Sequence, residues 1–229
     1  MDIASRILYE DNHLIAVNKR CGEIVQGDKT GDRTLPDEIK AFLKERDGKP
    51  GNVYCGVIHR IDRPVSGVVL FAKTSKALSR MNEAVKQREM QKTYWALCQE
   101  MPLHREGHLE DWLLRNEKNN KTYVVKAGTP QAKEGRLDYR TMGVTQGGYT
   151  LLEIDLHTGR HHQIRAQLAH MGCPIKGDLK YGAKRSNPDG GISLHARSIT
   201  FIHPVKREAV TIVAPAPEAP EWGEVRGKG

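Results

Sequence analysis

The sequence has few cysteines, few aromatic side chains and no long apolar run. Aromatic residues make up 6% of its 229 residues. The four cysteines, Cys21, Cys55, Cys98 and Cys173, lie 34, 43 and 75 residues apart, so no pair has the close spacing of metal ligands. A secreted disulfide scaffold usually holds more cysteine. We therefore expect reduced thiols and a cytoplasmic protein.

The longest apolar run, Val65–Ala72, is too short to cross a membrane. It has eight residues, two of them Ser66 and Gly67, whereas a transmembrane helix needs about 20. The first ten residues hold three charges and lack the apolar core of a secretory signal. We expect neither a membrane span nor secretion.

No linker, internal repeat or change in composition divides the chain. Its 229 residues fit one large domain. The last residues are rich in Pro, Ala, Glu and Gly, a composition typical of disorder. We predict one domain over residues 1–214 and a flexible tail over residues 215–229.

Positive charge is in excess and unevenly placed, with 36 Lys and Arg against 28 Asp and Glu, a net charge of +8. Val57–Lys92 holds eight basic and three acidic residues, and Leu156–Arg185 holds six basic residues and one acidic residue, Asp178. Two basic segments on a chain that is otherwise nearly neutral favour a surface for a polyanion such as nucleic acid. Because solvated lysine-rich faces are common, the charge alone leaves this open.

Short β-branched or alternating segments bounded by turn residues dominate the chain and predict strands. Apolar residues at helical spacing predict three helices: Leu35–Arg46, Lys76–Met90 with Ser75 as N-cap, and His161–Met171. This mixture predicts a single α+β domain with a mixed, largely antiparallel β-sheet flanked by a few helices. The predicted strands are Ile7–Tyr9, Leu14–Val17, Val68–Ala72, Thr93–Leu97, Thr122–Val125, Leu137–Thr141, Thr150–Leu156, Ile199–Ile202 and Val210–Val213.

In the first basic segment, the run His59–Gly67 holds a lone acid, Asp62, flanked by Arg60 and Arg63 and just before a predicted strand. Apolar Ile58 and Ile61 pull this acid toward the interior. A partly buried carboxylate beside arginine stays ionised and suits a nucleophile or base. The alternative is an exposed ion pair, which contributes only about 0–1 kcal/mol.

Ser66 with His59 as its base is a weak candidate for a nucleophile in the same run. The G-x-S-x-G turn of serine hydrolases needs a glycine where this chain has Pro64. We therefore do not expect a serine hydrolase.

The second basic segment holds three histidines, His157, His161 and His162, ahead of the third predicted helix. A zinc site is one interpretation, but no H-E-x-x-H pattern is present. A polar turn that leads into a helix N-terminus, where backbone N–H groups suit phosphate, is favoured. Arg165 lies early in this helix, where the helix dipole disfavours a cation. It therefore needs an anionic partner, which Asp62 or a phosphate would supply.

Tyr94 belongs to the predicted strand that closes the first basic segment. Strand alternation places Tyr94, Ala96 and Cys98 on one face. Taken alone, such a tyrosine is most often part of a core or of a sheet face.

A series of motifs runs along residues from about 5 to 214. They are Ile7–Asp11 and Val17–Lys19 at the start, then His59-Arg60-Ile61-Asp62 with Ser66-Gly67, Lys92-Thr93-Tyr94, Thr158-Gly159-Arg160 with His162-Gln163-Ile164-Arg165, Gly172-Cys173-Pro174-Ile175 with Gly177-Asp178 and Tyr181-Gly182, Leu194-His195-Ala196, and Phe201-Ile202-His203-Pro204. Together and in this order, these motifs resemble the RluA family of RNA pseudouridine synthases. The departures are Val65, where threonine is frequent, and Arg20-Cys21, where proline and a small residue are usual.

The resemblance implies a pseudouridine-synthase-like fold with a central cleft, acting on a uridine flipped out of tRNA or rRNA. It implies that Asp62 is the catalytic nucleophile or base, that Tyr94 stacks on the base and assists removal of the C5 proton, and that Arg165 pairs with the aspartate. Isomerisation of uridine needs no redox change, group donor or metal, so we expect no cofactor. The residues expected to bind RNA are Arg60, Arg63, Lys76, Arg80, Arg160 and His162.

Several alternatives stay open at this point. The chain could be a catalytically silent RNA-binding or RNA-chaperone protein of the same fold, and a metal-dependent hydrolase built on His157, His161 and His162 is a more distant possibility. The insert Gln99–Gly135 either grips RNA or forms a surface hairpin. The resemblance implies no protein partner, and we expect a monomer.

Overall fold

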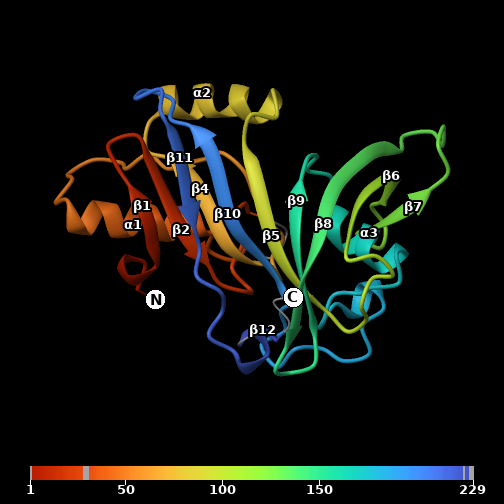
Figure 1. Ribbon diagram of the computed structural model, residues 1–229. Helices are drawn as coiled ribbons and strands as arrows, with labels where there is room; N and C mark the ends of the chain where they lie inside the picture. The colour runs from red at the N-terminus through yellow and green to blue at the C-terminus, as the bar shows by residue number, and fades with distance from the viewer. Residues whose placement is uncertain (1, 28–30, 224, 227–229) are drawn as a thin grey trace. The chain divides into compact units, whose positions relative to one another are not determined.

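The computed structural model describes residues 2–27, 31–223 and 225–226. The chain forms two compact units, which we describe separately (Figure 1). Unit 1 comprises residues 1–91 and 196–215, and unit 2 comprises residues 92–195 and 216–229. Within the described ranges, no helix is long and apolar enough to cross a membrane.

A largely antiparallel sheet forms the centre of unit 1. Its strand order is β1 (Ile7–Glu10), β2 (Leu14–Lys19), β4 (Ser66–Ala72) and β10 (Leu194–Ile202), with β11 (Ala209–Val213) on β10 and the short β3 (Gly56–Val57) on β4. Strands β2 and β4 are almost wholly buried, which agrees with their nearly continuous apolar sequences. The core of the unit therefore lies along these two central strands.

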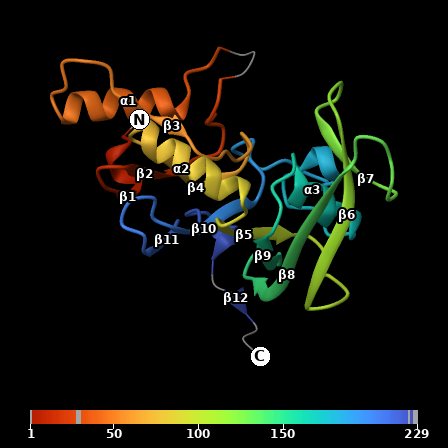
Figure 2. The same ribbon diagram turned by 90° about the horizontal axis from the view of Figure 1, so that it is seen from above.

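Two helices accompany this sheet. Helix α1 (Leu35–Arg46) lies along one face (Figure 2), where it buries Leu35, Ile39 and Leu43. It begins with a capping box in which Thr34 and Asp37 each bond to the other's backbone N–H.

Helix α2 (Ser75–Lys86) lies across the ends of the strands (Figure 1). The predicted N-cap of this helix, Ser75, is wrong by one residue. The cap is Thr74, whose side chain accepts a hydrogen bond from Ala77 N at 3.1 Å. The helix ends before the predicted Met90, because Arg88 adopts a left-handed conformation with φ of +60°.

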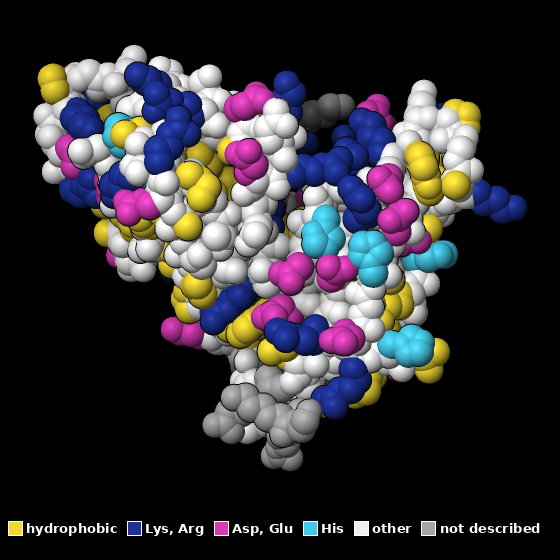
Figure 3. Space-filling view, turned by 45° about the horizontal axis from the view of Figure 1, so that its top comes forward, with side chains coloured by type: hydrophobic (Ala, Val, Ile, Leu, Met, Phe, Trp, Pro, Cys, Tyr) yellow, Lys and Arg dark blue, Asp and Glu magenta, His cyan; other side chains and the backbone are white. Residues whose placement is uncertain are grey.

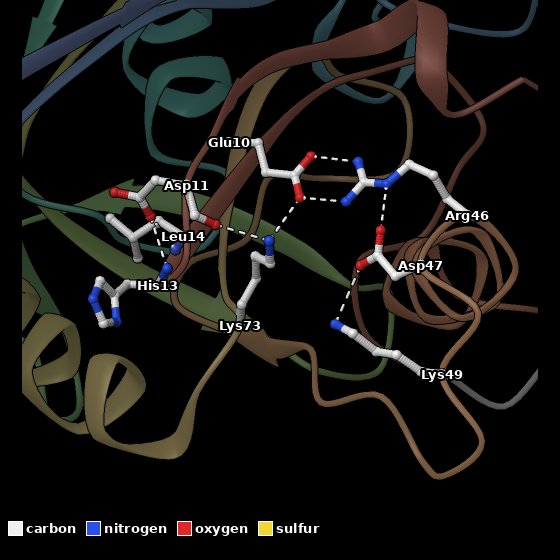
Figure 4. A network of polar contacts seen from close by, with 8 residues as sticks. All are labelled: Glu10, Asp11, His13, Leu14, Arg46, Asp47, Lys49 and Lys73. Atoms are coloured by element: carbon white, nitrogen blue, oxygen red, sulfur yellow. Dashed lines mark hydrogen bonds and ion pairs between the residues drawn. The ribbon is translucent and has the colours of Figure 1, made fainter.

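An ion network joins β1, β4 and the end of α1 (Figure 4). Glu10 accepts hydrogen bonds from both Arg46 Nη1 at 2.7 Å and Arg46 Nη2 at 2.8 Å, and from Lys73 Nζ at 2.6 Å. These bonds, led by those from Arg46, lower the pKa of Glu10 to about 2. A bidentate arginine pair adds geometric specificity as well as energy, so the network fixes α1 on the sheet.

Unit 2 also contains a set of antiparallel strands. Its strand order is β5 (Gln91–Cys98), β9 (Thr150–Leu156), β8 (Lys133–Thr145), β6 (Glu106–Asn116) and β7 (Lys121–Val125). Strand register places Tyr94, Ile154 and Tyr139 on one face, because directly paired residues point to the same side. The neighbouring Trp95 and Glu153 point to the opposite face.

Helix α3 (Gln163–His170) packs on the face of this sheet that carries Tyr94 (Figure 2). Gln167 Nε2 donates to Asp111 Oδ2 at 2.8 Å and to Gly135 O at 3.2 Å, and Leu168 is fully buried. The predicted start at His161 is two residues early. His162, with φ of +51°, is left-handed and ends the preceding turn.

Two segments differ from the sequence-based expectations. The insert Gln99–Gly135 contains β6, an 11-residue strand that the sequence analysis did not predict. Strand β6 pairs with both β7 and β8. In the segment predicted to be a tail, Pro220–Trp222 form a 3-10 helix and β12 (Val225–Arg226) pairs with β8. The domain boundary at residue 214 stays a prediction.

Candidate functional site

Asp62 lies in the loop between β3 and β4 and is half-buried. Its neighbours Ile58, Ile61 and Val65 are at most 8% exposed, so the apolar residues around the acid anchor the loop in the core as the sequence predicts. A turn follows, in which Val65 N donates to Asp62 O at 3.0 Å. The backbone that carries the carboxylate is therefore fixed.

Lys19, at the end of β2, is the strongest support of this loop. Its side chain is 1% exposed, and its Nζ donates to the carbonyl oxygens of Val65 at 2.6 Å, Arg63 at 3.0 Å, Asp62 at 3.3 Å and Arg20 at 3.0 Å. Burial lowers the pKa of Lys19 to about 8, so the ammonium keeps its proton at neutral pH. One buried cation thus gathers the carbonyl groups of Asp62 and of two residues that follow it in the loop.

His59 supports the same segment from its other end. Its Nε2 accepts a hydrogen bond from Leu70 N at 3.0 Å, and the ring is 9% exposed. The lone pair that a general base would use is therefore taken up by the backbone of β4. This contact argues against His59 as the base of a Ser66 nucleophile.

Gly67 allows β4 to pass close to β10. Its φ is +117°, and a Cβ at this position would overlap the backbone of Ala196. No other residue type fits both the conformation and the space. The close approach of β4 to β10 therefore explains why the Ser66-Gly67 motif, directly after the Asp62 loop, needs a glycine.

The predicted RNA-binding residues of unit 1 have exposed side chains. Arg60 Nη1 donates to Gln26 Oε1 at 3.0 Å, and Arg63 Nη2 lies 3.0 Å from Asp32 Oδ2. Lys76 and Arg80 lie on α2, where Arg80 Nη1 donates to Pro204 O at 2.8 Å. Exposed cations of this kind remain available to phosphate, because surface pairs such as Arg63–Asp32 are weak.

Arg165 has an anionic partner within unit 2. Its Nε donates to Asp178 Oδ2 at 2.6 Å and its Nη2 to Asp178 Oδ1 at 2.8 Å, with exposed fractions of 6% and 1%. The Tyr181 ring lies against the guanidinium, 5.0 Å from Cζ to the centroid. Asp178 and Tyr181 therefore hold Arg165 in one orientation. The predicted pairing of Arg165 with Asp62 stays a prediction.

Tyr181 also fixes His162. The Tyr181 hydroxyl oxygen accepts from Thr122 N at 2.8 Å and lies 2.9 Å from His162 Nδ1. Which of the two atoms donates in the Tyr181–His162 hydrogen bond depends on the tautomer of the ring. Burial, together with the nearby Arg165, lowers the pKa of His162 to about 2. In the folded protein His162 is thus a neutral ring, and its contact with RNA stays a prediction.

The turn before α3 is tied to β8 through side chains. Gln163 Oε1 accepts from Thr158 Oγ1 at 2.8 Å and from Arg160 N at 3.0 Å, while Arg160 Nε donates to Glu134 O at 2.9 Å. This turn is the polar turn that the sequence favoured over a zinc site. Its bonds position the partly exposed Arg160.

Tyr94 is 8% exposed and lies on the same face of the unit 2 sheet as α3 and Arg165. Lys92, two residues earlier, is partly buried, and this burial lowers its pKa. Strand alternation places Lys92 and Tyr94 on the same face. The structure thus brings a tyrosine and a basic side chain to the face that also carries the fixed arginine.

The tip of the β6–β7 hairpin is held at the N-terminus of α3. His161 Nδ1 lies 2.8 Å from Thr122 Oγ1, and His161 Nε2 lies 3.1 Å from Asn120 Oδ1. Lys180 Nζ donates to the carbonyl groups of Asn119 and Asn120 at 3.3 and 3.1 Å. The insert is thus a hairpin with a fixed tip rather than an independent surface loop.

The three histidines of the second basic segment do not gather around one point. His161 and His162 stack on each other with ring centroids 3.8 Å apart, whereas His157 Nε2 lies 2.7 Å from Asp138 Oδ2. Within residues 2–27, 31–223 and 225–226, the group able to hold a metal is instead His108, Asp138 and His157. This arrangement does not support a hydrolase built on His157, His161 and His162.

A cavity of about 720 Å³ in unit 1 lies away from the Asp62 loop and is lined by residues of the Glu10–Arg46 network. Its charged groups are paired with one another (Figure 4). None of the predicted catalytic residues lines it. It is therefore not the site that the sequence motifs indicate.

Two supporting residues were not assigned roles from the sequence. Lys19 is a charged residue at the end of an otherwise apolar strand, and Asp178 is the only acid in the second basic segment. A buried charge needs a partner, so each of these exceptions in composition was a signal. The sequence does not show which residue the partner is, because the partners are distant along the chain. Lys19 lies 43 or more residues before the Asp62 loop, and Asp178 lies 13 residues after Arg165.

Comparison with known proteins identifies the family. A family model described as RNA pseudouridylate synthase matches residues 13–170, which include Asp62, Tyr94 and Arg165. The chain is 33% identical over 231 residues to ribosomal large subunit pseudouridine synthase D of Xylella fastidiosa, covering 95% of this chain and 67% of that protein. It is 30% identical over 242 residues to tRNA pseudouridine synthase C of Haemophilus influenzae, covering 96% of this chain and 95% of that protein.

A solved structure with a similar fold also carries a pseudouridylate synthase name. The structure of human RNA pseudouridylate synthase domain containing 4 aligns with a TM-score of 0.78 at 23% identity, covering 94% of this chain and 90% of that one. This similarity confirms the α+β, pseudouridine-synthase-like fold. The chain spans 65% to 69% of the length of the first three curated relatives. Because the family model matches more than half of the sequence, the chain belongs to the RNA pseudouridylate synthase family.

Proposed function

We propose that this protein converts uridine to pseudouridine in tRNA or rRNA, with Asp62 as the catalytic carboxylate. The observation that supports this role is the fixed loop around Asp62, in which Lys19 gathers three of the loop's carbonyl groups. A catalytic group must be held close to its productive geometry, and a backbone supported in this way meets that need. Relatives named for tRNA and for ribosomal RNA support both substrate classes.

The reaction breaks the N1–C1′ bond, turns the uracil and rejoins it to the ribose through C5. An ionised carboxylate at the sugar begins it, either by attack at C1′ or by removal of the C2′ proton. A base then takes the proton from C5. Asp62 performs the first role, and Tyr94 stacks on the uracil and assists the second.

Arg165 stabilises the charge of the catalytic carboxylate. Its bidentate bond to Asp178 and its contact with Tyr181 fix the guanidinium before substrate binds. A preorganised charge costs no reorganisation during the reaction, and one such group contributes about 3–4 kcal/mol to the barrier in enzymes where it has been removed.

The exposed cations hold the RNA. The target uridine must leave the stack, which costs a few kcal/mol, and contacts to the neighbouring phosphates offset that cost. Arg60, in the same loop as Asp62, occupies the vacated position, while Arg63, Lys76, Arg80 and Arg160 contact phosphates. The neutral imidazole ring of His162, which is hydrogen-bonded to Tyr181, also contributes to RNA binding. No protein partner is required for these contacts, and we expect a monomer.

Tritium release tests the activity. The purified chain is incubated with tRNA and with rRNA that carry [5-³H]uridine, and the modified positions are mapped. We expect tritium release from at least one of the two RNAs. Binding of both RNAs without any release would instead support a catalytically silent RNA-binding protein.

A further inference from the structure

Three metal-ligating side chains meet on the face of the unit 2 sheet that does not carry Tyr94. His108 Nδ1 lies 2.6 Å from Asp138 Oδ1, and His157 Nε2 lies 2.7 Å from Asp138 Oδ2. One ligand atom from each residue lies within 4.8 Å of the other two. We refer to His108, Asp138 and His157 as the His–Asp–His cluster.

Strand register builds this cluster. His108 of β6 is directly paired with Asp138 of β8, and Asp138 is directly paired with Asp155 of β9. His157 follows Asp155 by two residues and so points to the same side. The cluster thus joins three neighbouring segments of unit 2, on the face of the strands opposite α3 and Tyr94.

The surroundings of the cluster are acidic. Glu110 Oε2 lies 3.7 Å from His108 Nε2, and Asp155 accepts a hydrogen bond from Thr93 Oγ1 at 2.8 Å. The nearby Arg140 is paired with Glu153 at 2.7 Å. In Figure 3, histidine and acidic side chains adjoin one another on the surface. The local charge therefore attracts cations and repels the phosphates of RNA.

A shallow groove adjoins the cluster at Asp138. It has a volume of about 430 Å³, and its lining includes Asp138, Asp155, Glu106 and Glu153. The cluster side chains are themselves 46% to 50% exposed, so they can change rotamer when an ion binds.

We propose that the His–Asp–His cluster binds one divalent transition-metal ion of the zinc class. Two imidazole nitrogens and one carboxylate oxygen are a ligand set that zinc takes in proteins, with a fourth position for water. Such ligands stand about 2.0–2.2 Å from the ion, so small rotations of the three exposed side chains are enough to place them. Magnesium and calcium prefer oxygen ligands, which makes them poor occupants.

The bound ion would link the strands rather than take part in the isomerisation. It joins β6 to β8 and to the end of β9, the segment that leads into the turn before α3. Anything that binds only the folded state raises its stability. The ion is therefore expected to raise the melting temperature of the protein and to leave tritium release from RNA unchanged.

Calorimetric titration of the untagged protein with zinc chloride tests this proposal. We expect one ion per chain, and binding at least about tenfold weaker in each of His108→Ala, His157→Ala and Asp138→Asn, because loss of even an outer-shell partner costs that much. Because all three side chains are exposed, the variants should fold, which their melting temperatures without zinc will check. Matched controls are His104→Ala and His170→Ala, exposed histidines outside the cluster.

The outcome separates a built site from adventitious binding. Zinc affinity that falls in the three cluster variants and persists in the two controls supports the site. No stoichiometric binding, or equal affinity in the cluster variants and the controls, would overturn it. Magnesium chloride, titrated in the same way, should show no binding, and equal affinity for magnesium and zinc would also contradict the proposed ligand set.

Discussion

A single buried ammonium group holds the backbone at Asp62 and directly after it. Lys19 donates to carbonyl groups of Asp62, Arg63 and Val65, three positions in one short loop. At the scale of the residue, the proposed catalytic carboxylate depends on a cation at the end of a strand 43 residues earlier in the chain.

Replacement of Lys19 by methionine should destabilise the protein. It leaves buried carbonyl groups without a donor, and a single unsatisfied group costs about 1–3 kcal/mol. We expect a loss of at least that size in the free energy of unfolding, measured with urea, and faster hydrogen exchange at the amide of Val65. Lys44→Met, at an exposed position of α1, is the control. Equal stability of the two variants would show that Lys19 does not support the loop.

His162 should make stability depend on pH between 7 and 5. Its pKa is about 2 in the folded state against an ordinary value of 6.5, so the unfolded state binds the proton first as the pH falls. Stability is therefore lost below about pH 6.5, by at most about 2 kcal/mol at pH 5. The carboxyl group of Glu10, with a pKa of about 2, loses its contribution only as the pH falls below its ordinary value of 4.5.

The variant His162→Phe isolates this effect. It keeps an aromatic ring and removes the titrating nitrogen, so its unfolding free energy should change less between pH 7 and 5 than that of the parent. His108, whose pKa is raised by Asp138, contributes in the opposite direction, with stabilisation that is lost as the pH rises. Because both proteins contain His108, the difference between them reports on His162. An identical pH dependence would contradict a neutral, buried His162.

At the scale of the element, close passage of strands sets the position of the site. Strand β4 follows the Asp62 loop directly, and at Gly67 it meets the backbone of β10. The loop can keep its place only if β4 keeps this approach.

Gly67→Ala should lower stability more than a glycine substitution that meets only strain. The new Cβ would overlap the backbone of Ala196 and would require a φ of +117° that alanine rarely adopts. We expect a loss of at least about 2 kcal/mol in unfolding free energy. Gly48→Ala has a φ of +58° and open space around it, so it controls for strain alone. Equal losses in the two variants would mean that the contact with β10 is unimportant.

Sequence patterns located the elements best where local signals agreed. Leu35–Arg46 was predicted with the observed bounds, because the apolar spacing that indicates it is a local signal. Strand β6 was missed, because its many charged residues disfavour a strand, and its pairing with β7 and β8 overrides that preference. The start of α3 was misplaced, because the left-handed backbone of His162 depends on contacts with Tyr181.

At the scale of the whole molecule, the sequence motifs indicated the family, and the contacts in the structure explain why residues of these motifs are needed. Asp62, Tyr94 and Arg165 were selected from the sequence, whereas the bidentate Asp178 partner of Arg165 became visible only in the fold. The His–Asp–His cluster was also beyond sequence reasoning, because His108, Asp138 and His157 come from three segments that register alone brings together.

Affinity for RNA should fall steeply with salt. If Arg63, Lys76, Arg80 and Arg160 each neutralise one phosphate, the slope of log affinity against log salt is about −2.8 for single-stranded RNA. Fluorescence anisotropy with a labelled RNA measures it. Lys76→Gln should reduce the magnitude of the slope by about 0.7, whereas Lys44→Gln should leave it unchanged. Affinity that stays flat up to physiological salt would contradict binding through these cations.

The central claim is that Asp62 performs the chemistry, and tritium release by Asp62→Asn tests it most directly. The amide keeps the size of the side chain but cannot act as nucleophile or base, so release from [5-³H]uridine RNA should fall by at least about 10³-fold, as for other catalytic residues. RNA affinity and the melting temperature should stay close to those of the parent, and Asp32→Asn, at an exposed position, should remain active. Release by folded Asp62→Asn at a rate close to that of the parent would contradict the assignment.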